Sequence, residues 1–246
     1  MKRSETVFLQ KKQMAKLYLI PNVLSDNDWQ LVLPAVVPEL ISNIKHYVVE
    51  NIRTTRRFLK QIDRNIDIDS LTFFELNKHS DKTQISEYLI PLEQGEDIAV
   101  ISEAGCPGVA DPGAGIVRIA HQKGLKVVPV VGPSSILLAL MASGLNGQNF
   151  AFNGYLPVKH PERKRAISAL EKIVMTEGQT QIVIETPYRN NALIDDLIKT
   201  CAPSTLLCIA CNLTAENEFI LTQPINEWRK QKPDINKQPS IFLLGR

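Results

Sequence analysis

Through the first 131 residues, short apolar runs alternate with longer segments in which apolar residues recur at helical spacing. The short runs are rich in β-branched and aromatic side chains, as buried strands are. They lie at residues 17–20, 47–50, 71–74, 97–102 and 126–131. Strands that alternate with helices in this way predict a mostly parallel sheet covered by helices.

The segments between these runs carry helix-end signals. The clearest helical patterns lie at residues 54–62, 81–95 and 115–124. Gly124 stands where the last of them needs a left-handed cap. Pro34 and Pro38 are expected to break the first connecting helix into pieces.

A second domain is expected after residue 147. An apolar helix at 134–144 is followed by small and polar residues at 145–149, which indicate a boundary. We therefore predict an N-terminal α/β domain at residues 1–147 and a C-terminal α/β domain at residues 148–246. The second should contain strands at 150–154, 181–185, 206–210, 219–222 and 240–244, and helices from near Pro161 and at 190–199. Consecutive strands late in the chain predict a mixed sheet with antiparallel pairs.

Composition agrees with a folded protein and narrows its class. Of the 246 residues, 44% are hydrophobic and 22% are charged, which excludes a wholly disordered or collagen-like chain. The net charge of +2 argues against a dedicated polyanion binder but is compatible with a local basic patch.

The cysteine count and the hydropathy pattern bear on the compartment. Four cysteines are too few for a disulfide scaffold and no secretory start precedes them, so we expect a cytoplasmic protein. The most apolar stretch, 127–145, is interrupted by Pro129, Gly132 and Pro133. We therefore expect no transmembrane helix and no membrane partner.

A glycine-rich segment directly follows the strand at 97–102. Four glycines fall within eleven residues, at Gly105, Gly108, Gly113 and Gly115. Loops at the carboxyl ends of parallel strands bind ligands in doubly wound sheets, and glycine lets a ligand approach main-chain N–H groups. The spacing matches neither G-x-G-x-x-G nor a Walker loop, which disfavours dinucleotide and triphosphate sites. The residues alone are compatible with a ligand loop or with an ordinary tight turn.

The next strand leads into a second loop, which opens a helix at Ser134 or Ser135. A serine hydroxyl at this position either caps the helix or bonds a ligand. Both loops should emerge at the same edge of the sheet, which predicts a crevice between them.

Several segments share the order and spacing of a known family. They read LYLIPNVLSD, VVENIRTTRRFL, AVISEAGCPGVADPGAGIVRIAHQKGLKVVPVVGPSS, GYLPVK and IVIETPYRN. They resemble the tetrapyrrole methylase superfamily of S-adenosyl-L-methionine-dependent methyltransferases, from Leu17 to Gly245. The resemblance implies two α/β domains with the cofactor in the cleft between them, usually in a homodimer. Within the superfamily the chain is most similar to the branch that methylates a ribose 2′-hydroxyl in small-subunit ribosomal RNA.

The resemblance also implies which residues contact the cofactor. They are Leu24, Gly105, Cys106, Val109, Ser135, Ile136, Thr186, Leu213, Pro239 and Ser240. The chain departs from the family pattern at Asn51 and Glu103, where relatives carry aspartate, and at Cys106, where they carry threonine. It also lacks the family's Arg-Glu pair near residues 211–215.

Methyl transfer from a sulfonium is an in-line displacement, for which the protein mainly aligns the reacting groups in a dry cleft. A ribose hydroxyl is a weak nucleophile at neutral pH, so a base within hydrogen-bond reach would help. The candidates, at or just after predicted strand ends, are Glu50, His79, Glu103 and Glu185. For His79, a surface histidine is an equal alternative, although the family pattern also shows a histidine there.

Basic residues indicate where a nucleic acid would bind. One helical pattern carries Arg53, Arg56, Arg57, Lys60 and Arg64. We predict that Arg53 and Arg56 bind substrate and that the others form a solvated face. A second basic group comprises Lys159, Arg163, Lys164 and Arg165, which together could guide RNA. Arg189 is a further substrate-binding candidate that could instead pair with Glu185.

Cys208 and Cys211 form a lone CxxC within a strand pattern. Strand positions three apart face opposite sides, so these thiols should not share a metal ion. We expect them to be buried small hydrophobes and expect no metal site.

These patterns predict a two-domain methyltransferase that acts on ribosomal RNA or on the small ribosomal subunit. Two alternatives remain at this stage. One is a methyltransferase with a tetrapyrrole-like small molecule or a protein as acceptor, and the other is a relative that binds cofactor or RNA without turnover.

Overall fold

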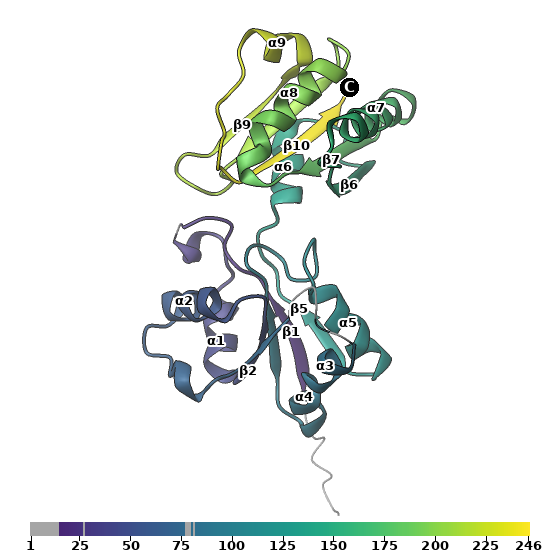
Figure 1. The fold of residues 1–246 in the computed structure, drawn as a ribbon. Helices are drawn as coiled ribbons and strands as arrows, with labels where there is room; N and C mark the ends of the chain where they lie inside the picture. The colour runs from purple at the N-terminus through teal and green to yellow at the C-terminus, as the bar shows by residue number, and fades with distance from the viewer. Residues whose placement is uncertain (1–14, 27, 77–79, 81) are drawn as a thin grey trace, which may run out of the picture. The chain divides into compact units, whose positions relative to one another are not determined.

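The computed structural model describes residues 15–26, 28–76, 80 and 82–246, and its contacts divide the chain into two units (Figure 1). The first unit comprises the residues up to Pro21 together with Ala35–Val131. The second comprises Asn22–Pro34 and Gly132–Arg246.

The division by contacts differs from the boundary expected after residue 147. Helix α6 (Ser135–Ser143) precedes that boundary, yet it belongs to the second unit. The reason is packing, because Ala139 and Leu140 are buried in an apolar cluster with strand residues of the second unit. The polar run at 145–149 is therefore a connection within the second unit.

The first unit contains a parallel sheet in the order β3-β2-β4-β1-β5. Its strands are β1 (Lys16–Ile20), β2 (His46–Val49), β3 (Thr72–Glu75), β4 (Ile98–Ile101) and β5 (Lys126–Pro129). Each lies within or beside a predicted apolar run, and β4 is buried throughout because it lies at the centre. The predicted parallel sheet is confirmed.

Helices cover both faces of this sheet. They are α1 (Val36–Asn43), α2 (Ile52–Ile62), α3 (Lys82–Glu87), α4 (Ile90–Gln94) and α5 (Gly113–Gln122), with a 3₁₀ turn η2 (Ile68–Ser70). Figure 1 shows α1 and α2 on one side of the sheet and α3, α4 and α5 on the other. The pattern predicted one helix at 81–95, but a separate helix, α4, begins at Ile90, and Pro91 stands in its first turn, where a proline is tolerated. Gly124 has the expected left-handed φ, 68°.

The second unit contains a mixed sheet in the order β6-β7-β10-β8-β9. Its strands are β6 (Phe150–Tyr155), β7 (Thr180–Ile184), β8 (Leu206–Cys211), β9 (Phe219–Pro224) and β10 (Ser240–Gly245). β6 and β7 are parallel, and the other neighbours are antiparallel, which confirms the predicted mixed sheet. The remaining elements are α7 (His160–Glu177), α8 (Asn190–Thr200), α9 (Ile225–Lys230) and the 3₁₀ turns η1 (Trp29–Leu31) and η3 (Pro187–Arg189).

Alternate residues of the second sheet enter two separate apolar clusters. One cluster joins the sheet to α6 and includes Cys208, and the other joins it to α7, α8 and α9 and includes Cys211. The two cysteines therefore face opposite sides, as their spacing predicted. Within the part of the chain that is described, no helix is long and apolar enough to cross a membrane.

Trp228 anchors α9 to the sheet, and its loss should destabilise the second unit. The indole is 2% exposed, and its Nε1 donates a hydrogen bond of 2.9 Å to the Leu207 carbonyl. Trp228→Phe leaves that carbonyl without the bond and removes buried volume, so we expect the free energy of unfolding to fall by about 2 kcal/mol. Urea unfolding followed by circular dichroism measures this. Trp29→Phe, at a half-buried position, serves as the control, and equal losses in both variants would contradict the prediction.

Candidate functional site

In the first unit, the parallel sheet brings two of the predicted bases to one edge. Val49 and Ile101 are partners in the β2–β4 register, so Glu50 and Glu103 follow adjacent strands at their carboxyl ends. The Glu103 N–H lies 3.3 Å from the Glu50 Oε1 and donates a hydrogen bond to it. These two candidates are therefore neighbours. His79 lies outside the described residues.

The first turn of α2 lies at the same edge of the sheet and contributes further polar groups there. Asn51 caps the helix, because its Oδ1 accepts from the N–H groups of Arg53 at 2.9 Å and Thr54 at 3.2 Å. Asparagine caps as well as the aspartate of the family pattern does, so this departure preserves the local structure. The Thr54 hydroxyl donates to Glu103 Oε1 at 2.6 Å, which ties the helix to the loop after β4.

The arginines of α2 have different surroundings. Arg53 is exposed in the first turn, beside Thr54. Arg56 is also exposed, and its guanidinium lies 5.2 Å from the centre of the Phe73 ring. Lys60 instead donates to the carbonyls of Arg64 and Ile66. Lys60 therefore binds the turn that follows its own helix.

The glycine-rich segment forms the loop between β4 and α5. Gly105 and Gly108 have left-handed φ angles of 69° and 83°, which glycine adopts without a side-chain clash. Ala110 also has a positive φ, 62°, which costs about 1 kcal/mol or more for a residue with a Cβ. The loop is thus held in a conformation that is unfavourable for Ala110.

Asp111, which our sequence analysis did not single out, holds this shape. Its Oδ1 accepts from the N–H groups of Gly108 at 2.8 Å and Gly113 at 2.7 Å. A Cβ on Gly113 would lie 2.9 Å from that oxygen, so glycine is required there for packing. Burial raises the pKa of Asp111, and the two amide hydrogen bonds oppose that rise. The Asp-Pro-Gly sequence at the start of α5 was the available signal.

In the second unit, four of the predicted cofactor residues lie at one edge of the mixed sheet. They are Thr186, Leu213, Pro239 and Ser240. β7 and β8 end at this edge and β10 begins there, because Ile184 pairs with Ile241 and Cys211 with Ser240. The Asn212 N–H also donates to the Pro239 carbonyl at 2.9 Å.

An apolar cluster lies under this edge. Leu213 is buried in it, and the partly buried Leu24 and Ile136 pack against it. The Ser25 and Thr214 hydroxyls are 3.0 Å apart, which ties the segment after β1 to the end of β8. Ser134 precedes α6 without a side-chain capping bond, so the capping interpretation is not supported there.

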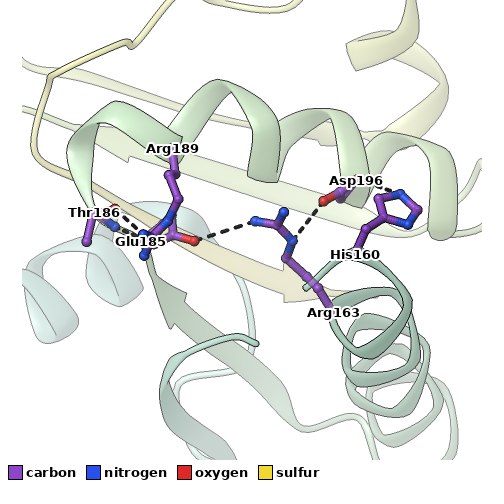
Figure 2. A network of polar contacts seen from close by, with 6 residues as sticks. All are labelled: His160, Arg163, Glu185, Thr186, Arg189 and Asp196. Atoms are coloured by element: carbon purple, nitrogen blue, oxygen red, sulfur yellow. Dashed lines mark hydrogen bonds and ion pairs between the residues drawn. The ribbon is translucent and has the colours of Figure 1, made fainter. Parts of the chain in front are cut away.

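Glu185, the remaining candidate base, is 5% exposed and lies within a network of ion pairs (Figure 2). Its Oε1 accepts from Arg189 Nη2 at 2.6 Å and from the Thr186 N–H at 2.6 Å. The Thr186 hydroxyl lies 3.2 Å from the same oxygen. On the other side, Arg163 Nη1 is 3.6 Å from Glu185 Oε2. The Glu185 carboxylate is therefore surrounded by donors of its own unit.

Arg163 extends this network into two helices. It projects from α7, is 8% exposed, and its Nε lies 2.8 Å from Oδ2 of Asp196 on α8. His160 Nε2 lies 3.3 Å from the other Asp196 oxygen. The expectation that Arg163 joins a basic surface for RNA is wrong, because its charge is buried between two carboxylates. Lys159, Lys164 and Arg165 are exposed.

One of the open alternatives is answered by these contacts. Arg189 pairs with Glu185, as one of its two expected roles required. Burial raises the pKa of Glu185, but hydrogen bonds from Arg189 and Thr186 outweigh that effect and hold the pKa below its ordinary value. Among the described residues, no group of three or more His, Cys, Asp or Glu side chains could hold a metal ion.

Comparison with known protein families identifies the family of this chain. The family model described as "Tetrapyrrole (Corrin/Porphyrin) Methylases" matches residues 38–228, well over half of the chain. The chain belongs to the tetrapyrrole methylase family. It is therefore an enzyme of the methyltransferase class, which confirms the family and the type of reaction expected from the sequence.

Three relatives of this methylase share one name, "Ribosomal RNA small subunit methyltransferase I". The protein from Escherichia coli O157:H7 is 28% identical over 232 residues, which cover 93% of this chain and 77% of that protein. The protein from Buchnera aphidicola subsp. Schizaphis graminum is 31% identical over 236 residues, with the same coverage. The Vibrio cholerae protein is 30% identical over 231 residues, covering 93% of this chain and 76% of its own.

Two solved structures share the methylase fold. The methyltransferase CobJ superposes with a TM-score of 0.61 at 14% identity, covering 94% of this chain and 93% of its own. The cobalt precorrin-4 methyltransferase CbiF gives 0.61 at 13% identity, covering 97% and 98%. Both confirm the two-domain α/β fold.

The ion pairs of Glu185 predict a pH-dependent contribution to stability. Because its folded pKa is lowered, the contribution is present above the ordinary carboxylate pKa of about 4 and is lost as the pH falls towards the folded value. At neutral pH, Glu185→Gln should lower the free energy of unfolding by about 3 kcal/mol, since two buried or half-buried arginines lose their counter-charge. Urea unfolding at a series of pH values measures the difference from wild type, which should narrow in acid.

The exposed Glu162 of α7 provides the matched control for this series. Glu162→Gln removes a carboxylate of the same kind but no buried ion pair, and should change stability by less than about 0.5 kcal/mol at every pH. A difference for Glu185→Gln that stays constant from neutral to acidic pH would contradict the assignment.

Proposed function

We propose that this methyltransferase uses S-adenosyl-L-methionine to methylate a ribose 2′-hydroxyl in small-subunit ribosomal RNA. The observation that carries the proposal is the similarity over 93% of the chain to proteins named for that RNA. The likeness to the cobalamin biosynthetic enzyme CbiF, at 13% identity, supports the fold alone. As the family resemblance implies, we propose a cytoplasmic homodimer.

The loop after β4 fits a ligand that lies against main chain. Gly105 and Gly108 carry no side chain, and their left-handed φ angles turn the backbone sharply. Asp111 accepts the Gly108 N–H. As the family resemblance implies, we assign ligand contacts to the main chain of Gly105, Cys106 and Val109. When bound, the cofactor would supply a methyl group on a sulfonium, and the protein would need no covalent intermediate.

The second unit fits the apolar part of such a ligand. An adenine ring favours apolar walls with a few polar partners at its rim. Leu24, Ile136 and Leu213 belong to one apolar cluster. We assign them to the adenine, with polar or main-chain contacts from the residues at the neighbouring strand and helix ends, which are Ser135, Thr186, Pro239 and Ser240.

We assign the general base to Glu103 and a positioning role to Glu50. Glu103 is exposed at the strand edge, and Thr54 orients its carboxylate. Glu50 accepts the Glu103 N–H and so fixes the turn on which Glu103 stands. Glu185 is a poorer candidate, because a carboxylate whose pKa is lowered by arginine accepts a proton less readily.

Arg53 and Arg56 are proposed to hold RNA phosphates near this edge. Both are exposed on α2, the helix whose first turn is bonded to Glu103. Guanidinium groups bind phosphate oxygens and make affinity depend on salt.

The proposed function is tested by incubating the protein with methyl-labelled cofactor and small ribosomal subunits from a strain that lacks the gene. We expect label in the RNA, at one nuclease-resistant 2′-O-methylated linkage. Label in a ribosomal protein or on a base would refute ribose methylation, and transfer to a tetrapyrrole alone would refute the RNA substrate.

Substitution of Gly108 tests the cofactor loop. Gly108→Ala should weaken cofactor binding at least 10-fold, because a Cβ strains the left-handed residue next to the proposed main-chain contacts. Calorimetric titration with the cofactor measures this change. Gly124→Ala is the matched control, since Gly124 has a similar φ but ends α5 with open space around its Cβ position. Equal affinities in the two variants would contradict the assignment.

Replacement of Glu103 tests the base. Glu103→Gln should lower kcat by about 100-fold while the affinity for cofactor stays the same, because general-base catalysis contributes that order of rate. Steady-state methyl transfer to small subunits provides kcat, and calorimetry provides the affinity. Glu75→Gln, an exposed glutamate at the end of β3 on the same edge, should leave both unchanged. An unchanged kcat in Glu103→Gln would exclude this residue as the base.

A further inference from the structure

β6 ends in a bulge that redirects its last side chain. Phe152 pairs with Ile182 and Tyr155 with Ile184, so β6 has one more residue between these pairs than β7 has. Gly154 provides the left-handed φ of 66° at this point. Without the extra residue Gly154 would stand beside Ile184, and the bulge gives that place to Tyr155. The Tyr155 side chain is 60% exposed.

A second exposed tyrosine follows the neighbouring strand. Tyr188 lies in η3, four residues after the end of β7, and is 68% exposed. The Arg189 guanidinium carbon lies 5.9 Å from the centre of the Tyr188 ring, which is a cation–π distance. The pKa of Arg189 is raised mainly by its hydrogen bond to Glu185, and in smaller part by Tyr188 and Tyr155. The Tyr188 ring therefore lies beside the guanidinium, and Tyr155, the β6 partner of Ile184, lies at the end of β7 that η3 follows.

Arg189 is held in place from the interior. Figure 2 shows Arg189 directed at Glu185, which is directed in turn towards Arg163. Asp196 holds the far side of Arg163 at 2.8 Å. The conformational entropy that Arg189 would lose on binding a ligand is therefore already lost in the folded protein.

We propose that Tyr155, Tyr188 and Arg189 form a platform on which an unpaired base of the RNA substrate stacks. The proposal rests on the RNA methyltransferase function proposed above, and it assigns a binding role to two tyrosines to which the family resemblance assigned none. Aromatic rings and guanidinium planes are the surfaces on which proteins stack single-stranded bases. Two exposed tyrosines beside a fixed arginine provide such surfaces. Single large apolar side chains are common at protein surfaces, whereas a group of them often marks a binding site.

The charge around the platform favours a polyanion over a protein surface. Lys159, Lys164 and Arg165 are exposed on the segment that follows Tyr155 into α7. Their charges would attract phosphates on either side of a stacked base. Tyr155 and Tyr188 would supply contact area at low entropic cost, because each has only two side-chain torsions.

The test measures binding of full-length protein to a short unstructured RNA that carries 2-aminopurine, whose fluorescence falls when the base stacks. Tyr155→Leu and Tyr188→Leu should each weaken binding by about 5- to 100-fold and lessen the fluorescence loss. Tyr188→Phe, which keeps the ring, should bind and quench as wild type does. The salt dependence of affinity should not change in the leucine variants, because no cation is removed.

Phe150→Leu is the matched control, since it removes a 38%-exposed aromatic ring from the opposite end of β6. It should bind as wild type. Unchanged binding in both leucine variants, or no fluorescence loss with the wild-type protein, would overturn the platform. So would leucine variants that bind intact small subunits less well but bind naked RNA normally, because that result would indicate a protein contact.

Failure of this proposal can be told apart from failure of the proposed function. If wild-type protein methylates subunit RNA and the leucine variants do so with unchanged KM and kcat, the function stands and the platform is refuted. If wild-type protein transfers no methyl group to RNA, the function is refuted independently of the binding result. A raised KM with unchanged cofactor affinity in the leucine variants supports both.

Discussion

The parallel pairing of β4 with β1 and β2 is the constraint on which the first unit's site depends. Parallel strands in one sheet end at the same edge, so residues more than fifty positions apart become neighbours. Glu50, the cap Asn51 and the loop from Glu103 to Pro112 all emerge there. If β4 ran antiparallel, its glycine-rich loop would lie at the opposite edge from α2, and the Thr54–Glu103 hydrogen bond could not form.

The second unit depends on a different interaction, which is the pairing of buried charges. Arg163, Glu185 and Asp196 are each less than a tenth exposed. A buried ion is costly unless opposite charges and hydrogen bonds surround it, and here each carboxylate contacts an arginine. The arrangement fixes the Thr186–Arg189 turn relative to α7 and α8. We therefore regard Glu185 as a positioning residue for the surface above it.

Periodicity could predict the elements because each strand and helix carries its signal locally. It could not predict that α6 belongs to the second unit, since its apolar residues are compatible with packing on either sheet. The family resemblance assigned Leu24, Ile136 and Leu213 to one ligand, and all three belong to one apolar cluster. It could not show whether Glu185 and Arg163 are exposed, because burial of a charged residue depends on partners from other elements. The CxxC pair was the opposite case, since strand geometry alone placed Cys208 and Cys211 on opposite faces.

Asp111, which was not among the predicted site residues, affects which ligands the glycine-rich loop can bind. The start of a helix ordinarily attracts anions, because its N–H groups are unpaired and carry partial positive charge. At α5 that role is taken by the Asp111 carboxylate, which accepts the N–H groups of Gly108 and Gly113. A second anion at the same point would meet both a like charge and engaged donors. We therefore propose that a ligand of this loop lies against the main chain from Gly105 to Val109, where the glycines contribute shape more than charge.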